Sequence, residues 1–174
     1  MQTFTIRPAA LTDNAAITRI YADAVRNGTA TFEIDPPDES EMARRQKMLF
    51  DGGYPYLVAT TADTVVAYAY AGPYRARPAY NWSVEDSIYV VPEMHRKGIG
   101  GLLLTRLIAE SAARGFRQMI AVIGDSAQVG SIAVHAKAGF SHIGTLRSVG
   151  FKHGQWLDTV LMQRALGRGD TTLP

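Results

Sequence analysis

The sequence predicts an α/β fold. Short apolar segments rich in Val, Ile, Tyr and Ala alternate along the chain with longer segments whose apolar residues recur at helical spacing. Strands that alternate with helices in this way are typical of an α/β sheet. With 174 residues, of which 47% are hydrophobic, the chain is long enough to bury one core. We expect a single domain at residues 1–165 and a flexible tail at 166–174, because the residues from Gly167 onward have little to bury.

Two helices and a hairpin are expected in the first half of the chain. The predicted elements are a strand around residues 4–6, a helix capped by Thr12 or Asp13 and ended by Asn27-Gly28, a second helix from about Glu39 to Gly52-Gly53, and strands at 56–59 and 65–70. A polar turn at Ala62-Asp63 separates the two strands, so they are expected to form a hairpin.

The second half repeats the alternation of strand and helix. The predicted elements are a strand at 84–91, a helix from Ile99 to near Gly115, a strand at 118–122, a helix at 126–138 and a closing pair of strands at 140–149 and 156–162. Ile99, Leu103 and Leu107 place an apolar stripe on the first of these helices, and Gly139 ends the second.

The composition indicates small partners. The formal net charge is +2, and the basic residues are scattered instead of gathered in runs with aromatic residues, which argues against nucleic acid. The chain has no cysteine, which excludes disulfides, thiol catalysis and thiolate metal sites. It begins without the features of a signal peptide, and no apolar stretch reaches the roughly 18 residues that would span a membrane. We therefore expect a cytoplasmic protein.

The most informative segment runs from residue 85 to residue 101. It begins with Glu85 and a β-rich run, continues with the turn His95-Arg96-Lys97-Gly98-Ile99-Gly100-Gly101, and opens an apolar helix. The first N–H groups of a helix have no partner within it, and glycines let a phosphate approach them closely. The segment therefore predicts a cradle for a pyrophosphate beside a carboxylate.

A dinucleotide-binding oxidoreductase is one alternative for such a turn. That class uses G-x-G-x-x-G, with an acidic residue about 20 residues further on at the end of the next strand. Here the glycines stand as Gly98-Ile99-Gly100-Gly101, without the third spaced glycine, and Val122 is not followed by the required acid at that strand's end. The sequence disfavours this class.

The strand, the Val91-Pro92 pair and the glycine turn resemble the acetyl-CoA motif of the GCN5-related N-acetyltransferases (GNAT). The segment from Ser131 to Phe140 is similar to a later helix of that family, with Gln128 where the family usually has Asn and His95 where it has Gln or Arg. The resemblance implies cofactor contacts at Tyr89, Val90, Val91, His95, Arg96, Lys97, Gly98, Ile99, Gly100, Gly101, Gln128 and Ser131.

Within that family the chain resembles the phosphinothricin acetyltransferase branch, which includes methionine sulfoximine and methionine sulfone acetyltransferases. The segments that carry this resemblance are 71–77 with Tyr80, 82–85, 121–124 and 149–158. It implies a mixed, mostly antiparallel central sheet with splayed strands, flanked by helices. It also implies acetyl-CoA as co-substrate with no metal, a small amino-acid acceptor acetylated on its α-amino group, and a homodimer.

Glu85 and His135 are the candidate catalytic residues. An amine attacks a thioester only after losing its proton, so a base is useful. Strand alternation puts Glu85, Ser87 and Tyr89 on one face, and from there the Glu85 carboxylate can point into the acceptor cleft and act as that base. The alternative is a solvated carboxylate. The resemblance implies unpaired backbone N–H groups near Tyr89 and Val90 for the developing negative charge, and places His135 where it can protonate the leaving thiolate. The alternative for His135 is a packing role.

Arg75 and Arg77 are the candidate acceptor-binding residues. Residues i and i+2 of an extended segment project to one side, and Pro78 favours the extended state of Arg77. Two guanidinium groups together favour an anion, although a solvated loop would have the same pattern. The resemblance adds Phe32, Ala76, Tyr80, Tyr89 and Val122 to the acceptor site, where aromatic residues at strand ends could equally belong to the core.

Two other functions remain open from the sequence. A non-catalytic acyl-CoA sensor would keep the cradle but would have no need of Glu85. Acetyltransferases of the same fold that act on protein N-termini or aminoglycosides would use an open or acidic groove, whereas Arg75 and Arg77 would repel a polycationic aminoglycoside.

Overall fold

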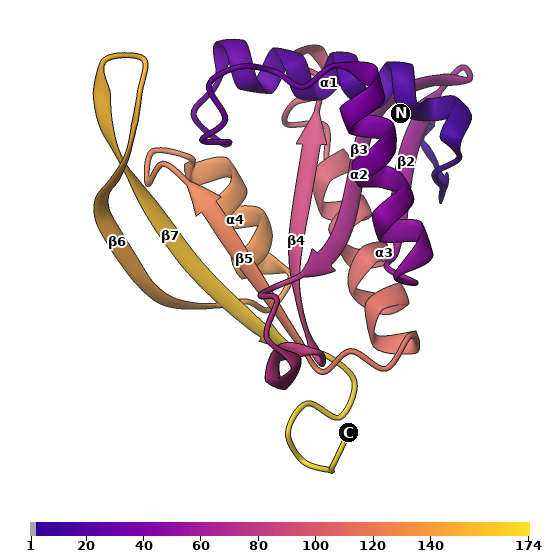
Figure 1. The fold of residues 1–174 in the computed structure, drawn as a ribbon, viewed down its shortest axis with the longest axis vertical. Coiled ribbons are helices and arrows are strands. Elements are labelled where there is room, and N and C mark those ends of the chain that lie inside the picture. Colours follow the sequence, from indigo (N-terminus) through magenta and orange to yellow (C-terminus); the bar gives the residue numbers. More distant parts are fainter. Residues whose placement is uncertain (1–2) are drawn as a thin grey trace.

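The computed structural model describes residues 3–174 as one seven-stranded sheet with helices on both faces (Figure 1). The elements are β1 (Thr5–Pro8), α1 (Asn14–Asn27), α2 (Glu39–Asp51), β2 (Tyr56–Thr61), β3 (Thr64–Pro73), β4 (Ser83–Val90), α3 (Ile99–Ala113), β5 (Gln118–Gly124), α4 (Val129–Lys137), β6 (Ser141–Lys152) and β7 (Gln155–Ala165). Short 3₁₀ turns lie at Leu11–Asp13, Pro78–Tyr80 and Pro92–Met94.

The strands lie in the order β1-β2-β3-β4-β5-β7-β6. Every neighbouring pair is antiparallel except β4 and β5, which run parallel and pair only from Ser83–Asp86 to Gln118–Ala121. Beyond Asp86 the strand β4 continues to Val90 without β5 as a partner. The mixed, mostly antiparallel sheet with splayed strands is thus confirmed. We call the place where β4 and β5 part the fork.

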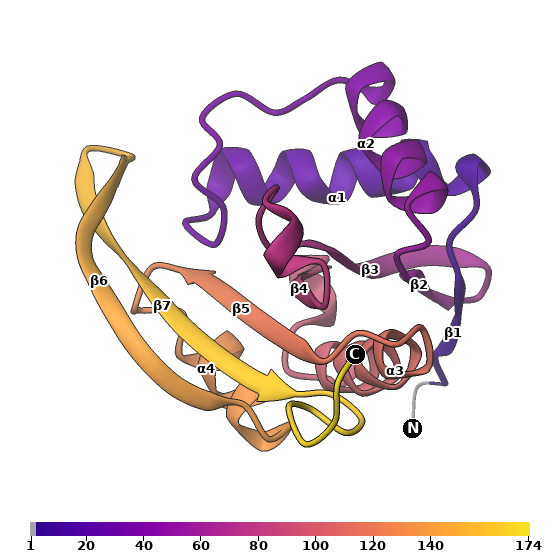
Figure 2. The ribbon, with the colours of Figure 1, turned by 60° about the horizontal axis from the view of Figure 1, so that its bottom comes forward.

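Each face of the sheet carries an apolar core, and Figure 2 shows the helices that lie on the two faces. On one face α3 buries Leu103, Leu104 and Leu107 against the strands, and α4 lies beside it. On the other face α1 and α2 cover a second core that includes Ile17 and Tyr68. Side chains of successive strand residues point to opposite faces, so alternate residues of β4 belong to different cores.

Strands β6 and β7 form a long ribbon at the edge of the sheet, which Figures 1 and 2 show extending beyond α4. It is longer than the predicted strands because residues 150–152 continue β6 up to a tight turn at His153 and Gly154, both at positive φ. Large apolar side chains remain exposed along this ribbon: Ile143, Leu146, Val149, Phe151 and Trp156.

Two boundaries differ from the sequence prediction. Helix α4 begins at Val129 instead of Ser126, because the Asp125 carboxylate accepts the N–H of Ala127 and Ser126 donates to Asp158, which holds these residues in a turn. Leu166, assigned to the flexible tail, is only 1% exposed and belongs to the α3-side core. Among residues 3–174, no helix is long and apolar enough to cross a membrane.

Candidate active site

The fork leaves part of the β4 backbone without a strand partner. Pairing with β5 ends at Asp86, while the N–H of Val91 donates to the carbonyl of Val66 on the β3 side (3.0 Å). Backbone groups of an antiparallel strand alternate in direction, so those of Ile88 and Val90 point away from β3 and into the fork. The fork therefore offers two N–H donors at one place.

This alternation corrects one of the two predicted backbone donors. Val90 faces the fork, whereas the backbone of Tyr89 faces β3, so Ile88 takes its place as the second candidate donor. The Tyr89 side chain packs edge-on against Tyr21, with ring centroids 5.0 Å apart. His95 Nε2 donates to the Val90 carbonyl (2.9 Å), so its ring is turned back to β4 instead of toward the glycine turn.

The glycine turn forms an open cradle at the start of α3. Arg96 (φ 58°) and Gly98 (φ 85°) adopt left-handed conformations that lead into the helix, which starts at Ile99. A Cβ atom added to Gly100 or Gly101 would meet no other atom within 4 Å. The free N–H groups of the first helical turn and the open surface above them fit a pyrophosphate.

Glu85 lies on the face of β4 that α1 and α2 cover. No register shift interrupts the β3–β4 ladder, so Glu85 shares its face with Tyr89, whose ring belongs to the core under α1 and α2. Burial and the negative charge of Asp86 raise the pKa of Glu85 to about 7, and the positive charge of Arg75 only partly offsets them. A carboxylate with this pKa can accept a proton near neutral pH.

The His135 side chain lies on the opposite face of the sheet from Glu85, and both of its ring nitrogens have hydrogen-bond partners. Nδ1 is 2.8 Å from the carbonyl oxygen of Ser131, and Nε2 is 2.9 Å from Oδ2 of Asp86. The side chain is buried, with Phe140 packed edge-on against the ring. His135 would have to break one of these hydrogen bonds to protonate a leaving group, so this geometry does not favour the direct acid role.

Sequence reasoning missed Asp86. The carboxylate is buried, and its Oδ1 atom has no hydrogen-bond partner within the described residues. A signal was present, because strand alternation places Asp86 between the apolar residues Val84 and Ile88 on the face opposite to Glu85. A charged residue within an apolar stripe requires a partner, which is His135 here.

The two predicted acceptor-binding arginines lie in the exposed β3–β4 loop. The Arg75 guanidinium stacks over the Tyr74 ring, 5.1 Å from its centroid, and Tyr80 packs edge-on against the same ring. Arg77 is extended (φ −80°, ψ 137°) before Pro78, as the sequence predicts. Within residues 3–174 neither arginine forms an ion pair with a carboxylate, so both guanidinium groups are available to an anion. Ala76 between them is also exposed.

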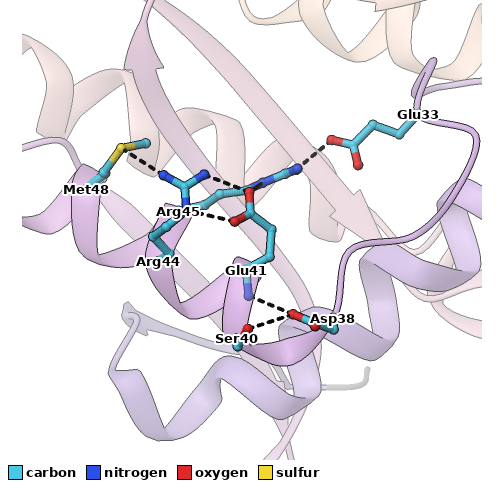
Figure 3. Close-up of polar contacts among 7 residues, drawn as sticks. All are labelled: Glu33, Asp38, Ser40, Glu41, Arg44, Arg45 and Met48. Atoms are coloured by element: carbon cyan, nitrogen blue, oxygen red, sulfur yellow. Dashed lines mark hydrogen bonds and ion pairs between the residues drawn. The ribbon is translucent and has the colours of Figure 1, made fainter.

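Residues 28–38, which connect α1 to α2, form a strap that is held by contacts with α1, α2 and β6. Thr31 is its central contact: its hydroxyl is 3.0 Å from Tyr21 Oη, and its carbonyl accepts a 2.8 Å hydrogen bond from Lys152 Nζ on β6. Toward α2, Glu33 pairs with Arg45 at 2.6 Å, and Figure 3 shows Arg45 between Glu33 and Glu41. Lys152 is only 3% exposed, and no local sequence pattern predicted its contact.

The ring of Phe32 fixes the strap against the strands. Cβ atoms added to Gly124 or Gly150 would come within 3.0 Å and 2.3 Å of this ring, so only glycine leaves room for it. Gln128, a predicted cofactor residue, instead donates to Thr29 Oγ1 on the strap (3.1 Å). Val122, predicted in the acceptor site, is partly exposed on β5.

Comparison with known proteins places this site in a family. The model of the acetyltransferase (GNAT) domain matches residues 6–161, nearly the whole chain. The chain belongs to the GNAT family of acetyltransferases, as the sequence motifs indicated.

Its similar relatives carry more specific names. The phosphinothricin N-acetyltransferase of Alcaligenes faecalis is 50% identical over 170 residues, which cover 98% of this chain and 86% of that protein. An L-methionine sulfoximine/L-methionine sulfone acetyltransferase of Pseudomonas paraeruginosa is 40% identical over 91% of this chain and 92% of its own length. The crystal structure of a phosphinothricin acetyltransferase from Sinorhizobium meliloti, in complex with AcCoA, has a TM-score of 0.96 at 50% identity and covers 99% of this chain and 93% of that one.

Proposed function

We propose that this chain is an acetyl-CoA-dependent N-acetyltransferase that acetylates the α-amino group of a small anionic or polar amino acid. The observation that carries the proposal is Glu85, a largely buried carboxylate beside the fork whose pKa is raised to about 7. The similar proteins named for phosphinothricin and for methionine sulfoximine and sulfone support the class of acceptor. Because acetyl-CoA is a cytoplasmic metabolite, the proposal includes a cytoplasmic location.

The residues of the cradle and the fork would hold the co-substrate. Acetyl-CoA supplies an acetyl group activated as a thioester. The N–H groups at the start of α3, with Arg96 and Lys97, bind the pyrophosphate, and the backbone of Val90 and Ile88 in the fork holds the arm that follows it. In this proposal the N–H groups of Ile88 and Val90 also stabilise the negative charge that develops on the carbonyl oxygen of the thioester.

Glu85 accepts the proton of the acceptor amine, directly or through one water. A free α-amino group has a pKa of about 8, so much of it is protonated at neutral pH and a base near pH 7 is useful. Glu85 lies on the face of β4 that α1 and α2 cover, whereas α3, whose start forms the cradle, packs on the other face. The two reactants thus approach the fork from opposite sides of the sheet.

Arg75 and Arg77 recognise the anionic groups of the acceptor. Each guanidinium can hold a carboxylate or phosphinate through paired hydrogen bonds, and hydrogen bonds to charged groups contribute about 1.5–3 kcal/mol each. Phe32, Tyr80, Tyr89 and Val122 complete the acceptor site in this proposal.

We also infer that the protein is a homodimer. The β6–β7 ribbon exposes the large apolar residues Phe151 (57%) and Trp156 (67%), and edge strand β6 has no neighbour on its outer side within the described chain. Apolar surface gathered on one exposed element is typical of a protein interface.

A turnover screen tests the proposal. Acetyl-CoA is incubated with amino acids that carry carboxylate, sulfone, sulfoximine or phosphinate side chains, and the released thiol is measured. We expect kcat/KM to be highest for acceptors whose side chain ends in such oxygens. Acetyl-CoA binding without thiol release for any amine would favour an acyl-CoA sensor, and a preference for peptides with free N-termini would favour a protein acceptor.

A further inference from the structure

Asp86 and His135 form a buried pair that the reaction proposed above does not yet use. Nε2 of His135 and Oδ2 of Asp86 are 2.9 Å apart, and the two side chains are 5% and 2% exposed. The two residues are 49 positions apart in the sequence and join β4 to α4. Asp86 is also the last residue of β4 that pairs with β5, so the pair sits at the base of the fork.

The hydrogen bonds of His135 define its protonation. A backbone carbonyl can only accept, so Nδ1 must carry a proton to bond Ser131 O at 2.8 Å. Nε2 faces a carboxylate oxygen, which accepts a hydrogen bond from a protonated Nε2 when Asp86 is ionised. Burial disfavours the charged ring, but the hydrogen bond and negative charge of Asp86 outweigh it and raise the pKa of His135 above its usual value. Asp86 therefore favours the imidazolium form of His135.

The same carboxylate acts on Glu85. Asp86 follows Glu85 on β4 with its side chain on the opposite face, so the two negative charges are separated only by the strand. The ionisable groups around Glu85 come from three elements: Asp86 on β4, Arg75 in the β3–β4 loop and Tyr70 on β3. Asp86 favours the protonated form of Glu85, whereas Arg75 favours the ionised form. His135 offsets part of the Asp86 charge.

We propose that Asp86 is a positioning residue of the reaction, which fixes His135 as an imidazolium at the base of the fork and sets the basicity of Glu85 on the other face of the sheet. The inference rests on the proposed role of Glu85 as the base. Neither Asp86 nor His135 needs to touch a reactant in this role. Asp86 is adjacent to Glu85 on β4 whereas its partner His135 lies beyond it on α4, so the Asp86 charge acts on Glu85 more strongly than the His135 charge does.

The dependence of kcat/KM on pH tests the inference with Asp86→Asn and Asp86→Ala. Removing the negative charge makes Glu85 a stronger acid, so its base form persists to lower pH. In these variants His135 loses its extra proton together with the Asp86 charge, so the two changes partly cancel at Glu85. Because Asp86 is the nearer charge, we expect the acidic limb of the profile to move down by less than about one pH unit. The plateau at high pH falls, because the base is weaker. The acceptor amine titrates alike for every variant, so differences between profiles belong to the enzyme.

The two variants separate charge from structure. Asparagine keeps a hydrogen-bonding side chain beside His135 and alanine does not, so Asp86→Ala unfolds more easily, while both move the acidic limb alike. Profiles of both variants that superimpose on that of the unchanged protein would overturn the inference. If Asp86→Ala does not fold, Asp86→Asn alone decides.

Nuclear magnetic resonance of the His135 ring gives a measurement independent of catalysis. In the ¹⁵N-labelled protein we expect both ring nitrogens to remain protonated well above the usual pH of histidine titration, and to lose this behaviour in Asp86→Asn. A neutral ring at pH 7 in the unchanged protein would contradict the inference. In the Glu85→Gln background, Asp86→Asn should no longer move the acidic limb of the pH profile. A fully active Glu85→Gln variant would refute the proposed role of Glu85 as the base. The measurement on the His135 ring would remain valid in that case.

Discussion

Glu85 and Asp86 are adjacent carboxylates with different surroundings because strand alternation sends them to opposite faces of β4. Glu85 faces the side covered by α1 and α2, where burial raises its pKa to about 7. Asp86 faces the side of α3 and α4, where it bonds His135. One peptide unit thus separates a candidate base from a structural anion. Their roles follow from the face that each occupies.

Glu85→Gln is expected to lower kcat by roughly 10²–10⁴, the usual contribution of a general base. Binding of acetyl-CoA should not change, because the cradle is formed by the start of α3. In the unchanged protein the rate should rise as the pH increases through about 7, where the carboxyl group of Glu85 loses its proton. Steady-state kinetics between about pH 5.5 and about pH 9 would measure both effects.

The matched control is Glu39→Gln, an exposed carboxylate at the start of α2. It should leave kcat and its pH dependence unchanged. If Glu85→Gln behaves like this control at neutral pH, Glu85 is not the base.

Arg75→Ala and Arg77→Ala are expected chiefly to raise KM for anionic amino acids. Each substitution removes a guanidinium that has no carboxylate partner within residues 3–174, so the loss should fall on the acceptor and not on the fold. The effect should be about 10- to 100-fold in KM, from hydrogen bonds to charged groups worth about 1.5–3 kcal/mol.

Arg168→Ala, an exposed arginine beyond β7, serves as the control and should not change KM. A neutral amine acceptor tested in parallel should also be little affected by the two loop substitutions. Equal losses for neutral and anionic acceptors would rule out an anion clamp.

The strap and the β6–β7 ribbon meet at the Phe32 ring, which links two elements far apart in sequence. The ring fits only because residues 124 and 150 lack side chains. Lys152 on the same ribbon bonds the carbonyl of Thr31, so the position of the strap depends on the ribbon. Thr31 of the strap contacts Tyr21, which packs against Tyr89 on the face of β4 that carries Glu85. A change on the ribbon should therefore reach the acceptor site.

Gly150→Ala is expected to displace Phe32, because the new Cβ would lie 2.3 Å from the ring. Overpacking of this kind destabilises by about 1–3 kcal/mol, which chemical denaturation would measure. We also expect kcat/KM for the acceptor to fall by about tenfold, because small displacements of a bound reactant slow its reaction strongly. The KM for acetyl-CoA should change little.

Gly144→Ala is the control on the same strand, because its Cβ would meet nothing within 4 Å. It should change stability by less than about 0.5 kcal/mol, as is usual for surface substitutions. Equal effects of the two substitutions on acceptor kinetics would show that the Phe32 contact does not position the strap.

At the scale of the whole molecule, the features that depend on local sequence patterns agree with the structure. The periodicity of Leu103 and Leu107 and the glycines around residue 100 predicted α3 and the cradle, and alternation correctly assigned the face of Glu85. Contacts between distant segments were beyond local patterns. Gln128 donates to Thr29, 99 positions away, and even the local bond from His95 to Val90, five positions back, does not follow from helix or strand spacing.

The remaining differences between the prediction and the structure involve contacts between residues that are far apart in the sequence. The Asp86–His135 bond requires that β4 and α4 meet, and the Lys152–Thr31 bond requires the ribbon to reach the strap. Leu166, predicted to lie in the tail, is buried because it packs in the core under α3. Local patterns therefore predict which residues each element presents, whereas the order of strands decides which of them meet.

The exposed apolar face of the β6–β7 ribbon predicts the assembly of the whole protein. Trp156→Glu places a charge where Phe151 and Trp156 pack edge-on, with ring centroids 5.2 Å apart, and should convert the proposed dimer to a monomer. Sedimentation velocity at several protein concentrations would measure this change. Leu11→Glu is the matched control, because Leu11 is a similarly exposed apolar residue (58%) that follows β1 at the opposite edge of the sheet, and it should leave the dimer intact. An unchanged protein that sediments as a monomer at every concentration would refute the dimer, and a dimer that survives Trp156→Glu would place its interface away from this ribbon. Lys152 on the ribbon also donates a hydrogen bond to the strap. Loss of the dimer should therefore weaken acceptor binding more than acetyl-CoA binding.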